Sequence, residues 1–183
     1  MKNVLIFGGT GMLLQTTKWL DRQTENVVVF GRTQSKNAWL VERKNKVGFE
    51  FYKLDYQETD KLKLAIHEIV SNVGVIDCVV AWIHSGAAPK ALSTILDELQ
   101  VVQQEPYHLF HIKGSSESIK SIQTKMDVPA NCLYREVLLG FYYDGQQSRW
   151  LTHHEISTGV IEAISEDVKT KTIGVLTPWE KRP

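Results

Sequence analysis

A glycine-rich turn near the N-terminus could bind a phosphate group. Residues 8–13 read Gly-Gly-Thr-Gly-Met-Leu; they follow an apolar run that ends at Phe7 and open a segment, residues 12–21, that can be helical. Glycines let the main chain approach a pyrophosphate, while the N–H groups and dipole of the new helix face its charge. A tight strand-to-helix turn without a ligand is the alternative. No Lys-Ser or Lys-Thr follows the glycines, which excludes a nucleoside triphosphatase loop, whereas a methyltransferase stays open.

The end of the second apolar run carries a cation where many dinucleotide-binding chains carry an acid. An Asp or Glu roughly 20 residues past the glycines would bind the ribose hydroxyls of NAD. Here Arg32 and Thr33 follow Gly31, and Ser35 and Lys36 come soon after. A guanidinium can donate two parallel hydrogen bonds to a 2′-phosphate, and the neighbouring side chains can add more. The sequence therefore predicts NADP in preference to NAD, with a solvated loop as the alternative.

His84 is the side chain best suited to proton transfer. It follows the fourth apolar run, and doubly wound folds place their ligands at the carboxyl ends of such strands. An imidazole with a pKa near 6.5 can exchange a proton at neutral pH. A polar residue that caps a strand end is the alternative interpretation. His108 and His111 are three positions apart on a predicted strand, an odd offset, so they should face opposite sides, and no metal site is predicted.

The elements that position these residues alternate between strand-length apolar runs and segments of helical period. Predicted strands cover residues 4–7, 27–30, 49–54, 75–83, 107–112, 133–143 and 172–176. Apolar residues at spacings of three and four predict helices over residues 62–73 and 91–99, and Thr152 with Glu155 has the capping-box spacing for a last helix. We therefore predict an α/β fold: a doubly wound parallel, Rossmann-like sheet of about seven strands in one domain, residues 1–183. The third strand alternates in polarity and should lie nearer an edge.

Composition limits the partners of this domain. The 183 residues include 21 Lys and Arg against 21 Asp and Glu, which removes the basic signature of nonspecific binding to nucleic acid or anionic membranes. The longest apolar stretch, residues 73–83, is shorter than a membrane-spanning helix, and the N-terminus lacks a secretory signal, so we expect a cytoplasmic protein. Cys78 and Cys132 are expected as reduced thiols. The expected partner is a small-molecule substrate or none, and association with a second copy stays open.

Taken together, the motifs resemble the short-chain dehydrogenase/reductase superfamily over nearly the whole chain. Its extended and atypical branches carry a Thr-Gly-x-x-Gly-x-x-Gly turn, to which residues 7–14 are similar, with Phe7 for the leading Thr and Leu14 for the last Gly. The resemblance implies an adenine-binding role for Asp55 after the third strand. It also implies cofactor contacts from residues 81–84 and a catalytic serine at Ser115, and residues 139–141 resemble the Pro-Gly turn after the sixth strand.

The superfamily's Tyr-x-x-x-Lys pair has no counterpart in this sequence. In that pair a phenol protonates the carbonyl, while the lysine lowers its pKa and holds the ribose. Ser116 and Ser121 each stand four residues before a lysine, but an aliphatic hydroxyl is too weakly acidic to replace a phenol of pKa about 10. Residues 115–131 are also few for a complete catalytic helix and its connection. The resemblance therefore implies a shortened member with non-standard catalytic residues.

Three functions follow from these patterns. The resemblance implies an NADP-dependent oxidoreductase that acts on a small carbonyl-type substrate. A noncatalytic NADP-binding sensor or regulator of the same fold is the alternative, and a structural or assembly protein with an empty cleft is the third. Trp150 and Trp179, near the ends of the last helix-strand unit, could cover a substrate pocket, pack the last helix or contact a second copy. The predicted cofactor-binding residues are Gly8, Gly9, Thr10, Gly11, Met12, Leu13, Arg32, Thr33, Asp55, Tyr56, Ala81 and Trp82; the predicted catalytic residues are His84 and Ser115.

Overall fold

The centre of the protein is a seven-stranded parallel sheet with the strand order β3-β2-β1-β4-β5-β6-β9. The computed structural model describes residues 1–33, 37–43, 46–84, 86–114 and 127–183. The strands of the sheet are β1 (Asn3–Phe7), β2 (Asn26–Gly31), β3 (Phe49–Lys53), β4 (Cys78–Ala81), β5 (Tyr107–Lys113), β6 (Cys132–Leu139) and β9 (Thr170–Ile173). The order reverses between β1 and β4, the place where doubly wound folds open a crevice for ligands. The predicted α/β class is confirmed, and β3 lies at an edge as expected.

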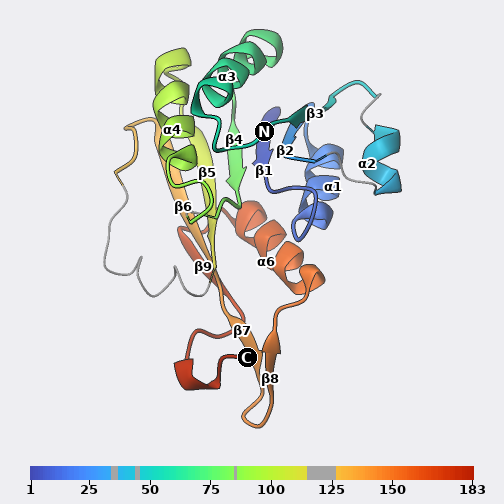
Figure 1. Cartoon of the computed structure of the whole chain (residues 1–183), viewed down its shortest axis with the longest axis vertical. Helices are drawn as coiled ribbons and strands as arrows, with labels where there is room; N and C mark the ends of the chain where they lie inside the picture. The colour runs from blue at the N-terminus through green and yellow to red at the C-terminus, as the bar shows by residue number, and fades with distance from the viewer. Residues whose placement is uncertain (34–36, 44–45, 85, 115–126) are drawn as a thin grey trace.

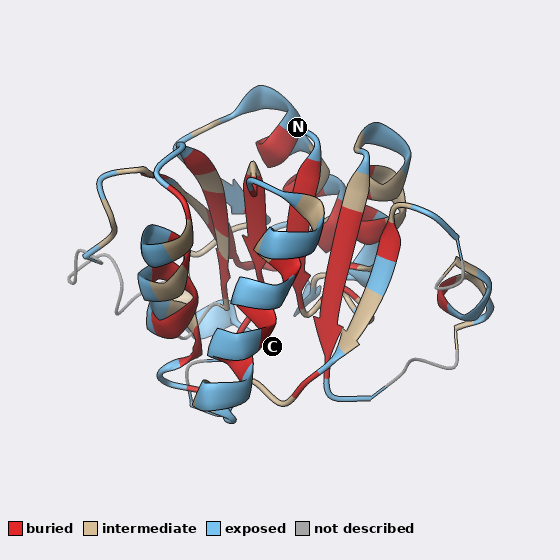
Figure 2. Cartoon of the chain, turned by 90° about the horizontal axis from the view of Figure 1, so that it is seen from above, coloured by how far each residue is buried: buried red, intermediate tan, exposed pale blue. Residues whose placement is uncertain are grey.

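Helices cover both faces of this sheet (Figure 1). They are α1 (Leu14–Gln23), α2 (Ala38–Arg43), α3 (Thr59–Val73), α4 (Ala91–Val102) and α6 (His153–Glu166), followed by the short 3-10 helix η1 (Trp179–Lys181). The apolar residues of α3 and α4 join one core cluster, and those of α1, α2 and α6 join the other. Figure 2 shows the central strands buried between these two layers. No helix in the described part of the chain is long and apolar enough to cross a membrane.

Local patterns explain two of the helices directly. The stripe of Leu62, Ala65, Ile66 and Ile69 in α3 is buried, as its spacing predicts. The capping box at the start of α6 is also confirmed: the Thr152 side chain accepts a hydrogen bond from the Glu155 N–H, and the Glu155 carboxylate accepts one from the Thr152 N–H at 2.8 Å. This box fixes the entry of α6 next to the carboxyl edge of the sheet.

The prediction of one long sixth strand over residues 133–143 is wrong. β6 ends at Leu139, and the chain turns out of the sheet into an antiparallel hairpin of β7 (Phe141–Tyr143) and β8 (Ser148–Trp150). The break falls at Gly140, where the main chain at Val175 passes so close that a Cβ would collide with it. We call this hairpin, residues 141–150, the arm; it projects from the carboxyl edge of the sheet together with η1 (Figure 1).

Several other boundaries also differ from the sequence predictions. β4 is shorter than predicted, and β9 begins at Thr170, two residues before the expected start. The elements α2, β8 and η1 were not predicted from the sequence. Each of these three is six residues long or shorter, so its periodicity is too brief to read.

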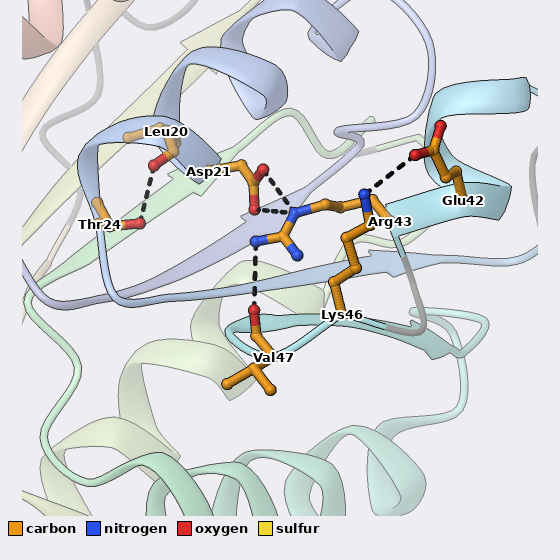
Figure 3. Close-up of polar contacts among 7 residues, drawn as sticks. All are labelled: Leu20, Asp21, Thr24, Glu42, Arg43, Lys46 and Val47. Atoms are coloured by element: carbon orange, nitrogen blue, oxygen red, sulfur yellow. Dashed lines mark hydrogen bonds and ion pairs between the residues drawn. The ribbon is translucent and has the colours of Figure 1, made fainter.

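An ion pair ties α2 to α1 (Figure 3). The Arg43 Nε lies 2.9 and 2.8 Å from the two carboxylate oxygens of Asp21, and its Nη2 donates to the Val47 carbonyl at 3.2 Å. Both side chains of the pair are largely buried, at 20% and 8% exposed. α2 follows the predicted 2′-phosphate site at Arg32 along the chain. The ion pair therefore fixes α2 against α1 downstream of that site.

Candidate functional site

A cavity of about 400 Å³ lies at the carboxyl ends of the strands on the β1-β2-β3 side. We call it the first cavity. Its walls include ten of the residues predicted from the sequence: Gly8, Thr10, Gly11, Met12, Arg32, Thr33, Asp55, Tyr56, Trp82 and His84. These residues come from four separate strand ends, so the fold brings the predicted cofactor turn, the predicted 2′-phosphate site and His84 to one place.

The glycines of the turn have different tasks. Gly8 has a φ of +80°, and a Cβ at this position would lie 2.6 Å from the Trp82 carbonyl oxygen. At Gly9 a Cβ would lie 2.6 Å from Thr17 Oγ1, so this glycine lets α1 pack closely against the turn. Gly11 has open space where its side chain would be, and it lines the first cavity. The turn is thus shaped by Gly8 and Gly9, while Gly11 leaves room for a ligand.

The amino end of α1 adds a positive dipole next to this turn. Leu13 holds the N-cap position and supplies no side-chain hydrogen bond, and the first turn of the helix carries no acid. The first N–H groups of a helix lack partners inside it and favour an anion. The Leu14 N–H is bonded to the Gly11 carbonyl at 3.0 Å, so it is the helix dipole beside a glycine turn that suits a pyrophosphate.

Tyr56 has a structural task that the sequence did not reveal. Its hydroxyl donates to the Phe30 carbonyl at 2.8 Å and accepts from the Gly8 N–H at 3.1 Å. Burial raises the pKa of Tyr56, so the phenol stays protonated at neutral pH. Tyr56 therefore ties the start of the glycine turn to the end of β2, in addition to lining the cavity.

Not every predicted residue reaches the cavity. Gly9, Leu13 and Ala81 are buried and do not line the first cavity. Ser115, the predicted catalytic serine, lies outside the described residues, as do Ser35 and Lys36. His84 is exposed at the cavity wall, with its ring edge-on to Trp82 at 4.8 Å between centroids.

A second cavity of about 230 Å³ adjoins the first. Its walls are formed by Met12, Trp82, Gly114, Leu139, Gly140, Trp150, Leu151 and Ile156. Met12 and Trp82 line both cavities, so the two spaces are neighbours. The sequence predicted Trp82 but not this cavity, because its walls come from the turn, three strand ends, the arm and α6.

A tyrosine and a lysine do meet in the structure, but on strands. On β5 and β6 a group of four side chains, His111, Lys113, Tyr134 and Glu136, forms what we call the strand cluster. His111 Nδ1 lies 3.0 Å from the Tyr134 hydroxyl, and the Lys113 ammonium contacts the Glu136 carboxylate and lies 5.8 Å from the Tyr134 ring centroid. None of the four lines either cavity. This pair therefore does not occupy the position that a catalytic Tyr-Lys pair requires, next to the reacting groups.

Burial controls the protonation states of the strand cluster. Burial is the main cause, and the nearby Lys113 charge a smaller one, of a His111 pKa lowered to about 3. Burial also raises the pKa of Tyr134 more than Lys113 lowers it. For Lys113, burial lowers the pKa, but its hydrogen bonds with Glu136 and Tyr134 outweigh that effect and leave the pKa above its ordinary value. At neutral pH the cluster thus holds a neutral imidazole, a neutral phenol and a charged lysine.

His108 and His111 point to opposite faces of the sheet, as predicted. His108 lies 3.4 Å from the Asp167 carboxylate and stacks on Phe110, whose side chain belongs to the α1 and α6 face, whereas His111 contacts Tyr134 on the other face. Within the described residues, no group of three or more potential metal ligands is found.

The pKa of His111 predicts how the stability of the fold depends on pH. The unfolded chain takes up a proton at this histidine near pH 6.5, whereas the native chain does so only near pH 3. Stability from this group is therefore complete above pH 6.5 and is lost as the pH falls toward 3, by at most about 1.4 kcal/mol per pH unit. We expect His111 to lower the free energy of unfolding by about 2 kcal/mol between pH 7 and pH 5, as measured by urea unfolding. In His111→Gln this contribution is absent, so the decrease between the two pH values should be about 2 kcal/mol smaller than in the wild type. The exposed-site variant His153→Gln should keep the wild-type pH dependence; equal behaviour of the two variants would contradict the prediction.

Comparisons with known proteins agree with this architecture. No protein-family model and no curated protein sequence matches the chain. Solved structures do: a β-ketoacyl-[ACP] reductase from Bacteroides thetaiotaomicron at 13% identity has a TM-score of 0.66, with 95% of this chain and 96% of that chain covered. A Serratia marcescens short-chain dehydrogenase/reductase variant at 14% identity has a TM-score of 0.69, covering 94% and 95% of the two chains. A metagenomic short-chain oxidoreductase solved with NADP, at 11% identity, has a TM-score of 0.66 and coverage of 95% and 96%. This chain has the fold of the short-chain dehydrogenases/reductases.

Proposed function

We propose that the first cavity binds NADP(H) and that the protein is an oxidoreductase acting on a small carbonyl compound. The observation that carries this proposal is that the glycine turn, which leads into the amino end of α1, and Arg32 line one cavity beside the strand-order reversal. Its volume of about 400 Å³ falls within the roughly 300–1,000 Å³ typical of small-molecule sites. One structure of the same fold, the metagenomic oxidoreductase, was solved with NADP.

The residues around the first cavity fit the parts of this cofactor. The turn and the first N–H groups of α1 would bind the pyrophosphate, Arg32 and Thr33 the 2′-phosphate, and Asp55 the adenine. When bound, NADPH supplies a hydride to a carbonyl carbon, and a proton transferred to the oxygen completes the alcohol. His84 at the cavity wall would deliver that proton.

A noncatalytic NADP(H)-binding protein is the second candidate. One observation favours it. The second cavity adjoins the proposed cofactor site, and its described lining contains no ionisable side chain that could act as an acid. The tyrosine and lysine of the strand cluster line neither cavity. Such a protein would bind the cofactor without turning it over.

Calorimetric titration with NADPH, NADP and NAD tests both candidates. Binding of NADPH at micromolar concentration, followed by its oxidation over a panel of aldehydes and ketones, would support the oxidoreductase. At saturating NADPH, turnover should then fall at least tenfold in His84→Ala. Binding without turnover would support the second candidate, and no binding at millimolar cofactor would overturn both.

The Arg32→Asp variant is expected to lose selectivity for the 2′-phosphate. A charge-assisted hydrogen bond contributes roughly 1.5–3 kcal/mol, so NADPH affinity should fall about 10- to 100-fold while NADH affinity stays within a few-fold. Titration of NADPH and NADH into the wild type and into Arg32→Asp measures the ratio of the two affinities. Arg32→Lys keeps the positive charge but cannot donate two parallel hydrogen bonds, so its NADPH affinity should lie between those of the wild type and Arg32→Asp. An unchanged NADPH/NADH ratio in Arg32→Asp would remove the assignment.

A further inference from the structure

The second cavity is small and apolar. Its side-chain walls are two indoles, from Trp82 and Trp150, and the aliphatic or thioether groups of Met12, Leu139, Leu151 and Ile156. No Asp, Glu, Lys, Arg or His is present among the residues that line it in the described part of the chain. A charged ligand would gain no ionic partner from these described residues when it loses its water shell, which costs far more than burying an uncharged ring.

Three cations near this cavity are already engaged. Lys113, which precedes Gly114, contacts the Glu136 carboxylate. Arg149 precedes Trp150, and its guanidinium donates to both Glu155 oxygens at 2.9 Å and lies 4.3 Å from the Tyr142 ring centroid. Arg182 lies 4.3 Å from the Trp179 ring centroid and 5.9 Å from that of Trp150. A bidentate ion pair and stacking on aromatic rings hold these guanidinium groups in place. The arm therefore contributes the Trp150 ring to the cavity wall, while Arg149 binds Glu155 of α6.

The size and the indoles of the cavity favour a flat ligand. Its volume of about 230 Å³ is below the roughly 300–1,000 Å³ of sites for drug-sized molecules, so one or two rings would fill it. Trp82 follows β4 and Trp150 ends β8, so the two indoles reach the cavity from separate elements. Aromatic rings pack against each other more favourably than their buried area alone accounts for. Trp150 is half exposed and is not part of the buried core.

We infer that the second cavity is the substrate site and that it selects an uncharged aromatic ketone or aldehyde of one or two rings over the corresponding carboxylate. The inference rests on the proposed function, because the substrate must lie beside the cofactor, and the shared walls at Met12 and Trp82 place the two cavities side by side. It extends that function by naming the chemical class of the carbonyl compound.

A matched pair of probes tests this selection. Methyl 2-naphthyl ketone and 2-naphthoate have the same ring system and the same number of non-hydrogen atoms, but only the second is charged at pH 7. Binding of each to the full chain is measured by calorimetry, with and without saturating NADPH. We expect the ketone to bind at least tenfold more tightly than the carboxylate. Equal affinities, or tighter binding of the carboxylate, would overturn the inference.

Two aromatic residues of the arm supply the variant and its control. Trp150 lines the second cavity and is 50% exposed; Tyr142 is 39% exposed on the same hairpin and does not line it. Trp150→Ala should weaken ketone binding at least tenfold, and Tyr142→Ala should leave it within twofold. Trp150→Lys brings an ammonium group to the cavity and should reduce the preference for the ketone over the carboxylate at least tenfold. Equal effects of Trp150→Ala and Tyr142→Ala would place the ligand elsewhere and overturn the inference.

The cofactor titration separates this inference from the proposed function. If NADPH binds and the ketone does not, the inference fails while the NADP(H) site stands. If the ketone binds with the expected selectivity and NADPH does not, the proposed oxidoreductase fails, and with it the assignment of the cavity as a substrate site. Circular dichroism of each variant confirms that it is folded before binding is compared.

Discussion

The Lys113→Met variant is expected to lose about 3 kcal/mol of its free energy of unfolding, because removing one partner of a buried ion pair leaves the other charge without compensation. The Lys113 side chain is 8% exposed and that of Glu136 is 21% exposed, so the carboxylate that remains reaches water only in part. Methionine keeps the length of the aliphatic stem, which limits the change to the loss of the charge. Urea unfolding at pH 7, followed by far-ultraviolet circular dichroism, measures the difference.

The double variant Lys113→Met/Glu136→Leu is the control for this prediction. With both charges replaced by apolar groups of similar size, no unpaired charge is left, and stability should return to within about 1 kcal/mol of the wild type. A loss below about 1 kcal/mol in Lys113→Met alone would show that the pair contributes little. A double variant as unstable as the single one would assign the loss to packing.

The Gly8→Ala variant is expected to lose about 3 kcal/mol of stability and, with it, the shape of the glycine turn. An alanine at a φ of +80° costs roughly 1–2 kcal/mol, and its methyl group would lie 2.6 Å from the Trp82 carbonyl oxygen, which adds roughly 1–3 kcal/mol of overpacking. Because Trp82 lines both cavities, the resulting shift reaches the walls of both. Thermal unfolding and NADPH titration of the same preparation measure the two effects.

Gly11→Ala is the matched control in the same turn. Gly11 lines the first cavity and has no atom within 4 Å of the place that its Cβ would take. The substitution should leave the free energy of unfolding within about 0.5 kcal/mol, as surface substitutions usually do. It should nevertheless weaken NADPH binding at least tenfold, since the methyl group enters the space proposed for the pyrophosphate. Unchanged NADPH affinity in Gly11→Ala would contradict the placement of the cofactor on this turn.

The strand cluster changes the interpretation of the missing Tyr-x-x-x-Lys motif. That motif brings a phenol and an ammonium together on one helix. Here Tyr134 and Lys113 meet across two neighbouring strands, and the strand register sets His111 opposite Glu136. His111 binds Tyr134 and Lys113 binds Glu136, and these contacts link β5 to β6. The acid for catalysis under the proposed function is therefore His84, which stands at the cavity wall.

Local sequence determined much of the fold of this protein. Residues 8–13 predict a turn because glycines are required where φ is positive and where α1 packs closely, and Thr152 with Glu155 predicts the start of α6 because the two side chains bond to each other's main chain. The continuous apolar runs of β1, β2 and β4 predict strands that are covered on both faces. Each of these features depends on residues within a few positions of one another, so the pattern of residue types suffices.

Only the tertiary structure decided which distant side chains meet. The turn out of the sheet at Gly140 depends on the main chain of Val175, and the second cavity needs Met12, Trp82 and Trp150 from three elements. The His111–Tyr134 contact joins residues 23 positions apart through the register of two parallel strands. Such contacts depend on strand order, register and the path of the chain between elements, which periodicity does not encode. The sequence thus determined the sheet and the glycine turn, and the packing of the arm against the strand ends decided the shape and apolar character of the space beside them.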